Sequence, residues 1–209
     1  MVTSAYKLKH WPPFLARLQF AVLSLVVLLA LIALGMRGWM HVGPGALAAH
    51  GSDAAWLWRL GTMVLPAVLT AAISGRWWWK AQQSPVRIAA LLILMSALGS
   101  LALALWPLRL DTPLDPINAK AGVAYALWWL SGTAAAVVAA FGLKKPIVTV
   151  IAALLVGLAG LQISGVLNLT APALVGWLQL LLFALGLDQW VRVTYTKEFT
   201  QRQSPEVQP

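Results

Sequence analysis

Residues 122–167 read GVAYALWWLSGTAAAVVAAFGLKKPIVTVIAALLVGLAGLQISGVL, and this stretch decides the fold. It contains two apolar runs, 122–143 and 147–167, which carry no charged residue and are separated only by the tripeptide Lys-Lys-Pro at 144–146. About 20 apolar residues in a helix cross the hydrocarbon core of a bilayer, which is roughly 30 Å thick. The stretch therefore predicts two transmembrane helices joined by a tight basic turn.

The same pattern extends outward over the rest of the 209-residue chain. The predicted spans are Leu18–Met36, Ala55–Ser74, Ile88–Leu108, Gly122–Leu143, Ile147–Leu167 and Ala171–Val191. The runs are continuous and lack the alternation of a membrane β-barrel strand, so we expect an all-α, polytopic membrane helical bundle of six transmembrane helices. This transmembrane domain covers 18–191, between an N-terminal tail of 1–17 and a C-terminal tail of 192–209.

Composition excludes several classes of protein. The chain is 60% hydrophobic and 10% charged, whereas a soluble domain carries about 25% charged residues. It has no cysteine, which excludes a disulfide framework, a thiol enzyme and a cysteine-ligated zinc or iron–sulfur site. No nucleophile elbow, phosphate-binding loop or HExxH motif is present, so we expect a protein that is not an enzyme.

Proline marks the expected helix starts. Pro85, Pro116 and Pro146 each sit where a first helical residue loses nothing by lacking an N–H group. Ser84 and Asp115 precede two of them and are suited to cap the free N–H groups of the first turn. These positions predict helix starts at the breaks between the spans.

Lysine and arginine are distributed unevenly between the two sides of the predicted bundle. Eleven lie in the tails and the even-numbered connections: Lys7, Lys9, Arg17, Arg76, Lys80, Arg87, Lys144, Lys145, Arg192, Lys197 and Arg202. Four lie on the other side: Arg37, Arg59, Arg109 and Lys120. Basic residues stay cytoplasmic, so we expect both termini in the cytoplasm of a bacterial cell, with the protein in its inner membrane. Anionic lipid headgroups account for the net charge of +9 without any nucleic-acid partner.

Small residues form one stripe on the fifth span. At 100° per residue, this stripe contains Thr149, Ala153, Gly157, Gly160, Ser164 and Asn168. Small residues let a neighbouring helix approach closely, and the neighbour is either another helix of this chain or a different subunit. Gln162 lies on the opposite side of the same helix, at a depth similar to that of Gln179 on the sixth span. We expect these two amides to share a hydrogen bond.

Hydroxyl side chains are the main polar groups of the other spans. If the protein is a transporter, these hydroxyls and one proline are expected to line the path of a small solute: Thr62, Pro66, Thr70, Ser96, Ser100, Ser131 and Thr133. Pro66 removes a backbone hydrogen bond and is expected to kink its helix and expose the carbonyl of Thr62. No ionisable side chain lies at the middle of a span, which disfavours proton-coupled transport. Asp188, near the inner end of the sixth span, has Arg192 four residues on and is expected to pair with it.

Most of the twelve tryptophans fall near predicted span ends, as expected of interfacial rings. Trp128, Trp129 and Trp177 lie deeper and are candidates for contact with a pocket, a pigment, a lipid or a partner subunit. No cofactor ligated by this chain is expected, because its three histidines lie in a tail or loop.

Met40, His41, His50 and Asp53 share the first outer loop and form the only candidate metal set, for which copper is the suitable ion. Two segments, Ala126–Gly132 and Ile163–Asn168, loosely resemble parts of the bacterial CopD-type copper-resistance membrane proteins. The resemblance covers about two helices and lacks the family's histidines near the first segment. Copper handling is therefore the most distant of the alternatives.

These observations favour a non-catalytic subunit of a larger membrane complex (respiratory, photosynthetic or transport). Its expected partners are the lipid bilayer and either other membrane subunits or further copies of this chain. The second interpretation is a small-solute transporter or channel that uses the hydroxyl-lined path.

Overall fold

The computed structural model describes residues 55–80, 84–107, 109, 114–163 and 172–203, together with Ala48 and nine positions between 17 and 32. In the last helix, side chains are described for 175–189 and for Arg192. Over this part of the chain every regular element is a helix and no strand is present, so the predicted all-α class is confirmed.

The elements in chain order are α3 (Ala55–Arg59), the π-helical turn η1 (Leu60–Val64), α4 (Leu65–Lys80), α5 (Ser84–Leu105), α6 (Pro116–Leu143), α7 (Pro146–Ile163) and α9 (Pro172–Gln203). Four segments are long and apolar enough to cross a membrane: Ala55–Trp79, Ser84–Leu105, Pro116–Leu143 and Pro146–Ile163. In α9 the described apolar stretch, Val175–Gln189, is shorter. The protein is thus a multi-pass membrane protein. The first predicted span lies mostly outside the described residues, although its eight described positions are helical, and six spans remain a prediction.

The helix starts follow the proline and capping signals more closely than the hydropathy. The side chain of Asp115 accepts a hydrogen bond from the backbone N–H of Ile117 at 2.8 Å, and Pro116 is the first residue of α6. The helix therefore begins six residues before the predicted apolar span, because a cap marks the start of the helix and hydropathy only the part within lipid. The C-terminal end of α6 is closed by Lys144, which adopts a left-handed conformation and donates its N–H to the carbonyl of Ala140 at 3.0 Å.

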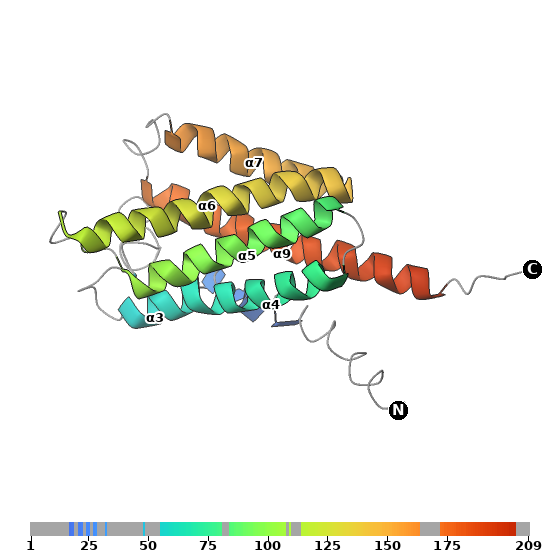
Figure 1. Cartoon of the computed structure of the whole chain (residues 1–209), viewed down its shortest axis with the longest axis horizontal. Coiled ribbons are helices and arrows are strands. Elements are labelled where there is room, and N and C mark those ends of the chain that lie inside the picture. The colour runs from blue at the N-terminus through green and yellow to red at the C-terminus, as the bar shows by residue number, and fades with distance from the viewer. Residues whose placement is uncertain are drawn as a thin grey trace, which may run out of the picture.

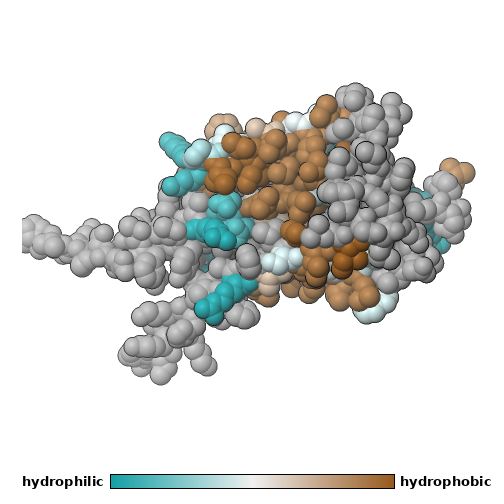
Figure 2. Space-filling model, turned by 180° about the vertical axis from the view of Figure 1, so that it is seen from behind, coloured by the Kyte–Doolittle hydropathy of each residue, from teal (hydrophilic) through white to brown (hydrophobic). Residues whose placement is uncertain are grey.

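Helices α4, α5, α6 and α7 lie side by side in chain order, and α9 passes behind α5 and α6 (Figure 1). Consecutive helices pack on each other, most extensively α5 on α6, and α9 contacts α4, α6 and α7. On the face that Figure 2 shows, the described residues are largely hydrophobic, with hydrophilic ones towards the ends. Elsewhere in the described structure, large apolar side chains such as Val123 and Phe141 are exposed, as expected of a surface in contact with lipid.

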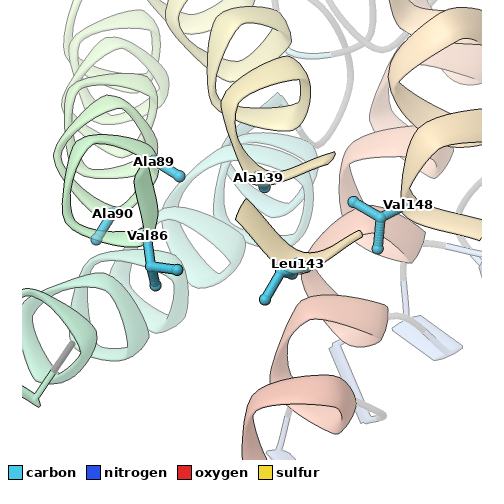
Figure 3. Close-up of a cluster of buried hydrophobic side chains, with 6 residues drawn as sticks. All are labelled: Val86, Ala89, Ala90, Ala139, Leu143 and Val148. Carbon is cyan, nitrogen blue, oxygen red and sulfur yellow. The ribbon is translucent and has the colours of Figure 1, made fainter. Parts of the chain in front are cut away.

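At one end of the bundle, small and branched side chains from three helices form a tight cluster. Val86, Ala89 and Ala90 of α5 face Ala139 and Leu143 of α6, and Val148 of α7 completes the group (Figure 3). Deeper in the bundle, α5 and α6 come closest at Gly99, where an added Cβ atom would lie 2.9 Å from the carbonyl oxygen of Ala124. Glycine at this position is what lets the two backbones approach.

Candidate functional site

A cavity of about 110 Å³ lies where the helices meet. Its wall combines residues of α4, α5, α6, α7 and α9 with Thr62 of η1 and Val22 of the N-terminal region. Alanines such as Ala97 on α5 and Ala135 on α6 form part of this wall. Their short side chains leave space that leucine or phenylalanine would fill.

The cavity gathers most of the residues predicted to line a solute path. Five of the seven line it: Thr62, Pro66, Thr70, Ser96 and Ser100. The other two, Ser131 and Thr133, are buried on α6 but are not part of the lining. The hydroxyl of Ser131 donates to the carbonyl of Leu127, whereas the Thr133 hydroxyl has no partner among the described residues.

Three of the lining hydroxyls, those of Thr62, Ser96 and Ser100, donate their protons to backbone carbonyls. Thr62 Oγ1 donates to the carbonyl of Trp58 at 2.6 Å, one helical turn earlier. Ser96 Oγ donates from α5 to the carbonyl of Trp128 on α6 at 2.7 Å. Such bonds between helices hold them together in lipid. These hydroxyls therefore stabilise the wall and do not offer a free proton to a solute.

The segment before Pro66 contains a turn that the sequence did not predict. Residues 60–64 form the π-helical turn η1, in which the N–H of Leu65 bonds to the carbonyl of Leu60 five residues earlier. The carbonyl of Met63, within this turn, accepts a hydrogen bond from Ser100 Oγ of α5 at 3.1 Å. The kink at Pro66 and the exposed carbonyl of Thr62 stay predictions. Single π turns are frequent at functional sites.

An aromatic group closes another side of the cavity. The rings of Trp128 and Phe183 both line it and meet edge to face, with 5.1 Å between their centroids. Phe183 reaches this position because α6 has Gly132 there: a Cβ atom added at Gly132 would lie 2.6 Å from Phe183 Cε1 and 3.0 Å from Ser96 Oγ. Gly132 therefore creates the notch that the phenylalanine ring occupies.

The other two deep tryptophans do not line the cavity. Trp177 is buried in a neighbouring cluster with Ala48, Trp58 and Leu180. Trp129 is buried on α6, and its indole nitrogen has no hydrogen-bond partner in the described part of the chain. Of the three tryptophans predicted to face a pocket, the structure places Trp128 at this one.

A closed ring of three hydrogen bonds joins α6, α7 and α9. Gln179 Nε2 donates to Gln162 Oε1 at 2.8 Å, so the bond expected between these amides is present. Gln162 Nε2 donates to the hydroxyl oxygen of Tyr125 at 3.0 Å, and that hydroxyl donates to Gln179 Oε1 at 2.9 Å. Gln179 is fully buried, at 0% exposure. Tyr125 was not among the predicted residues, although a tyrosine inside an apolar span needs a polar partner and is itself a signal.

The small-residue stripe of α7 faces outward. Ala153, Gly157 and Gly160 are exposed, and a Cβ atom added at either glycine would meet nothing within 4 Å. The buried face of α7 is formed instead by Val148, Ile151, Ala152 and Leu155. Of the two alternatives, packing of this stripe within the chain is not found among the described residues, and Ser164 and Asn168 lie outside them.

No charge is available at the cavity. Its described lining contains no aspartate, glutamate, lysine, arginine or histidine. The expected pair of Asp188 and Arg192 is present at 2.7 Å on α9, outside the lining. The candidate metal residues, Met40, His41, His50 and Asp53, lie outside the described residues, and within the described part of the chain no three potential ligands form a metal-binding group. The described site is thus an uncharged one.

No family model matches the chain, and no curated protein or solved structure matches it either.

Proposed function

We propose that this protein is a non-catalytic subunit of a larger complex in a bacterial inner membrane, and that it docks through the outer face of α7. The observation that carries the proposal is the open space above Gly157 and Gly160, on a face that is exposed in the described structure. Without a hydrophobic driving force in lipid, helices associate through close backbone contact at small residues.

The shape of this face supports the same interpretation. At 100° per residue, exposed Val150 and Leu154 lie on one side of the glycines and exposed Val156 on the other. The glycines are therefore flanked on both sides by larger exposed side chains. The side-chain ridges of one helix pack into the spaces between the side chains of another, and the glycine positions leave such a space free.

The absence of cysteine allows a direct test in the native membrane. The natural chain has none, so in an Ala153→Cys variant a photoactivatable maleimide labels the outer face of α7 alone. Irradiation of membranes from the source cell is expected to yield one defined adduct with another membrane chain. The matched control is Gly122→Cys on α6, a second exposed position with open space above it, which is expected to give lipid adducts alone. Equal adducts from both variants, or lipid adducts alone from both, would contradict the proposal.

A second candidate function is a transporter of a small uncharged solute, in which the cavity is part of the path. Support comes from the five predicted path residues that line it. The donation of three of their protons to carbonyls weighs against a polar solute. A transporter is expected to be stable alone, with a melting temperature that rises with its solute, whereas a subunit is expected to lose stability when separated from its partners.

A further inference from the structure

We propose that the central cavity binds one uncharged hydrocarbon group about the size of a benzene ring. The group is either the end of a lipid chain or a free small aromatic molecule. This inference concerns the interior of the bundle and does not depend on docking through α7.

The hydrogen-bonding state of the wall selects an apolar ligand. The lining contains no ionisable side chain, so a charged ligand would lose its hydration without gaining a counter-charge. The hydroxyls of Thr62, Ser96 and Ser100 already donate to backbone carbonyls at 2.6–3.1 Å. A polar solute that took a proton from any of these three hydroxyls would have to break its bond, which leaves Thr70 as the remaining hydroxyl of the lining, while a hydrocarbon leaves all three bonds intact.

The volume of the cavity indicates the size of the ligand, and its surface indicates an apolar one. A dry apolar cavity of about 150 Å³ in a soluble protein binds benzene, and the cavity here, at about 110 Å³, is somewhat smaller. Ala97, Ala135 and Ala139 give a smooth wall, and Trp128 and Phe183 contribute aromatic surfaces. Left empty, such a wall loses dispersion contacts that a hydrocarbon restores.

The first test uses benzene and a variant in which the cavity is filled. Ala97→Ile adds three carbons at the lining, and Ala104→Ile makes the same change on α5 outside the lining. In detergent, benzene at ten times its Kd is expected to raise the melting temperature of the wild type and of Ala104→Ile by about 3–6 °C relative to Ala97→Ile. An equal response in all three proteins would mean that benzene acts through the micelle, and would overturn the proposal.

If Ala97→Ile fails to fold, a second variant, in which the cavity is enlarged and not filled, provides the test. Phe183→Leu shortens a lining side chain and enlarges the cavity, and Phe141→Leu makes the same change at an exposed position of α6. Naphthalene is expected to raise the melting temperature of Phe183→Leu, and to leave the wild type and Phe141→Leu unchanged. If naphthalene affects all three alike, the cavity is not its binding site and the proposal fails.

The two sources of the hydrocarbon are separated by repeating the benzene experiment in phospholipid nanodiscs. If a lipid chain fills the cavity, the benzene response seen in delipidated detergent solution disappears in the bilayer. If the site serves a free small molecule, the response persists. Either outcome supports the hydrocarbon site, and the absence of a cavity-dependent response in both media contradicts it.

Discussion

Glycine occurs in two contrasting regions of this molecule, between α5 and α6 and on the outer face of α7. At Gly99 and Gly132 an added Cβ atom would meet a neighbouring helix within 3 Å, whereas at Gly157 and Gly160 it would meet nothing within 4 Å. Glycine therefore allows a close contact between helices at the first two positions and faces open space at the other two. The difference indicates that small residues alone do not decide whether a helix face packs within the chain, because this depends on the arrangement of the bundle.

The largest expected effect is at the closed contact. Gly99→Ala forces a methyl group against the backbone of α6, 2.8 Å from the Cα atom of Trp128 and 2.9 Å from the carbonyl oxygen of Ala124. Backbone cannot move aside as a side chain can, so we expect a loss of about 2–3 kcal/mol in the free energy of unfolding. Denaturation with sodium dodecyl sulfate in mild detergent measures it. A loss below about 0.5 kcal/mol would show that α5 and α6 are not this close.

A smaller loss is expected at the notch occupied by Phe183. Gly132→Ala meets the tip of that ring at 2.6 Å, and the ring has some freedom to shift, so we expect a loss of about 1–2 kcal/mol. Combining it with Phe183→Leu should recover part of the loss, because the shorter side chain leaves room for the methyl group. Strict additivity of the two changes in the same denaturation assay would argue against the contact.

The hydrogen-bonded ring is expected to contribute less than either contact. Gln179→Leu removes two of the three bonds, and Gln162→Leu also removes two, because the bond between the two amides is lost in both variants. Interhelical hydrogen bonds in lipid average about 0.6 kcal/mol each, so each change is expected to destabilise the protein by about 1 kcal/mol. A double-mutant cycle between these positions should give a coupling of about 0.6 kcal/mol, and zero coupling would contradict the ring.

The smallest effect on the isolated chain is expected at the open face. Gly157→Ala should leave its free energy of unfolding unchanged or raise it by up to about 1 kcal/mol, because alanine favours the helix over glycine and nothing obstructs its methyl group. The same denaturation assay measures it. A loss comparable with that of Gly99→Ala would show that this face packs within the chain.

The sequence predicts features that depend on one helix or on depth in the membrane. Capping by Asp115, the pair of Asp188 and Arg192 and the bond between Gln162 and Gln179 follow from spacing and depth, and all three are present. Four of the predicted spans correspond to helices long and apolar enough to cross a membrane.

Features that depend on which helices are neighbours could not be predicted in this way. The roles of Gly99 and Gly132 require knowledge that α5 lies against α6 and that Phe183 of α9 reaches α6. The same applies to the outward orientation of the α7 stripe, because periodicity identifies a face but not its surroundings. The π-helical turn before Pro66 changes the hydrogen-bond register locally, and hydropathy carries no signal for that change.

Docking of this protein in a larger membrane complex is tested by native mass spectrometry of the protein extracted from its own membrane in mild detergent. We expect the wild-type chain to carry other membrane chains in fixed stoichiometry. We also expect Gly157→Leu, which fills the open space at this position without obstructing the fold, to release them. A wild-type chain found alone, or partners retained equally by Gly157→Leu, would contradict this docking.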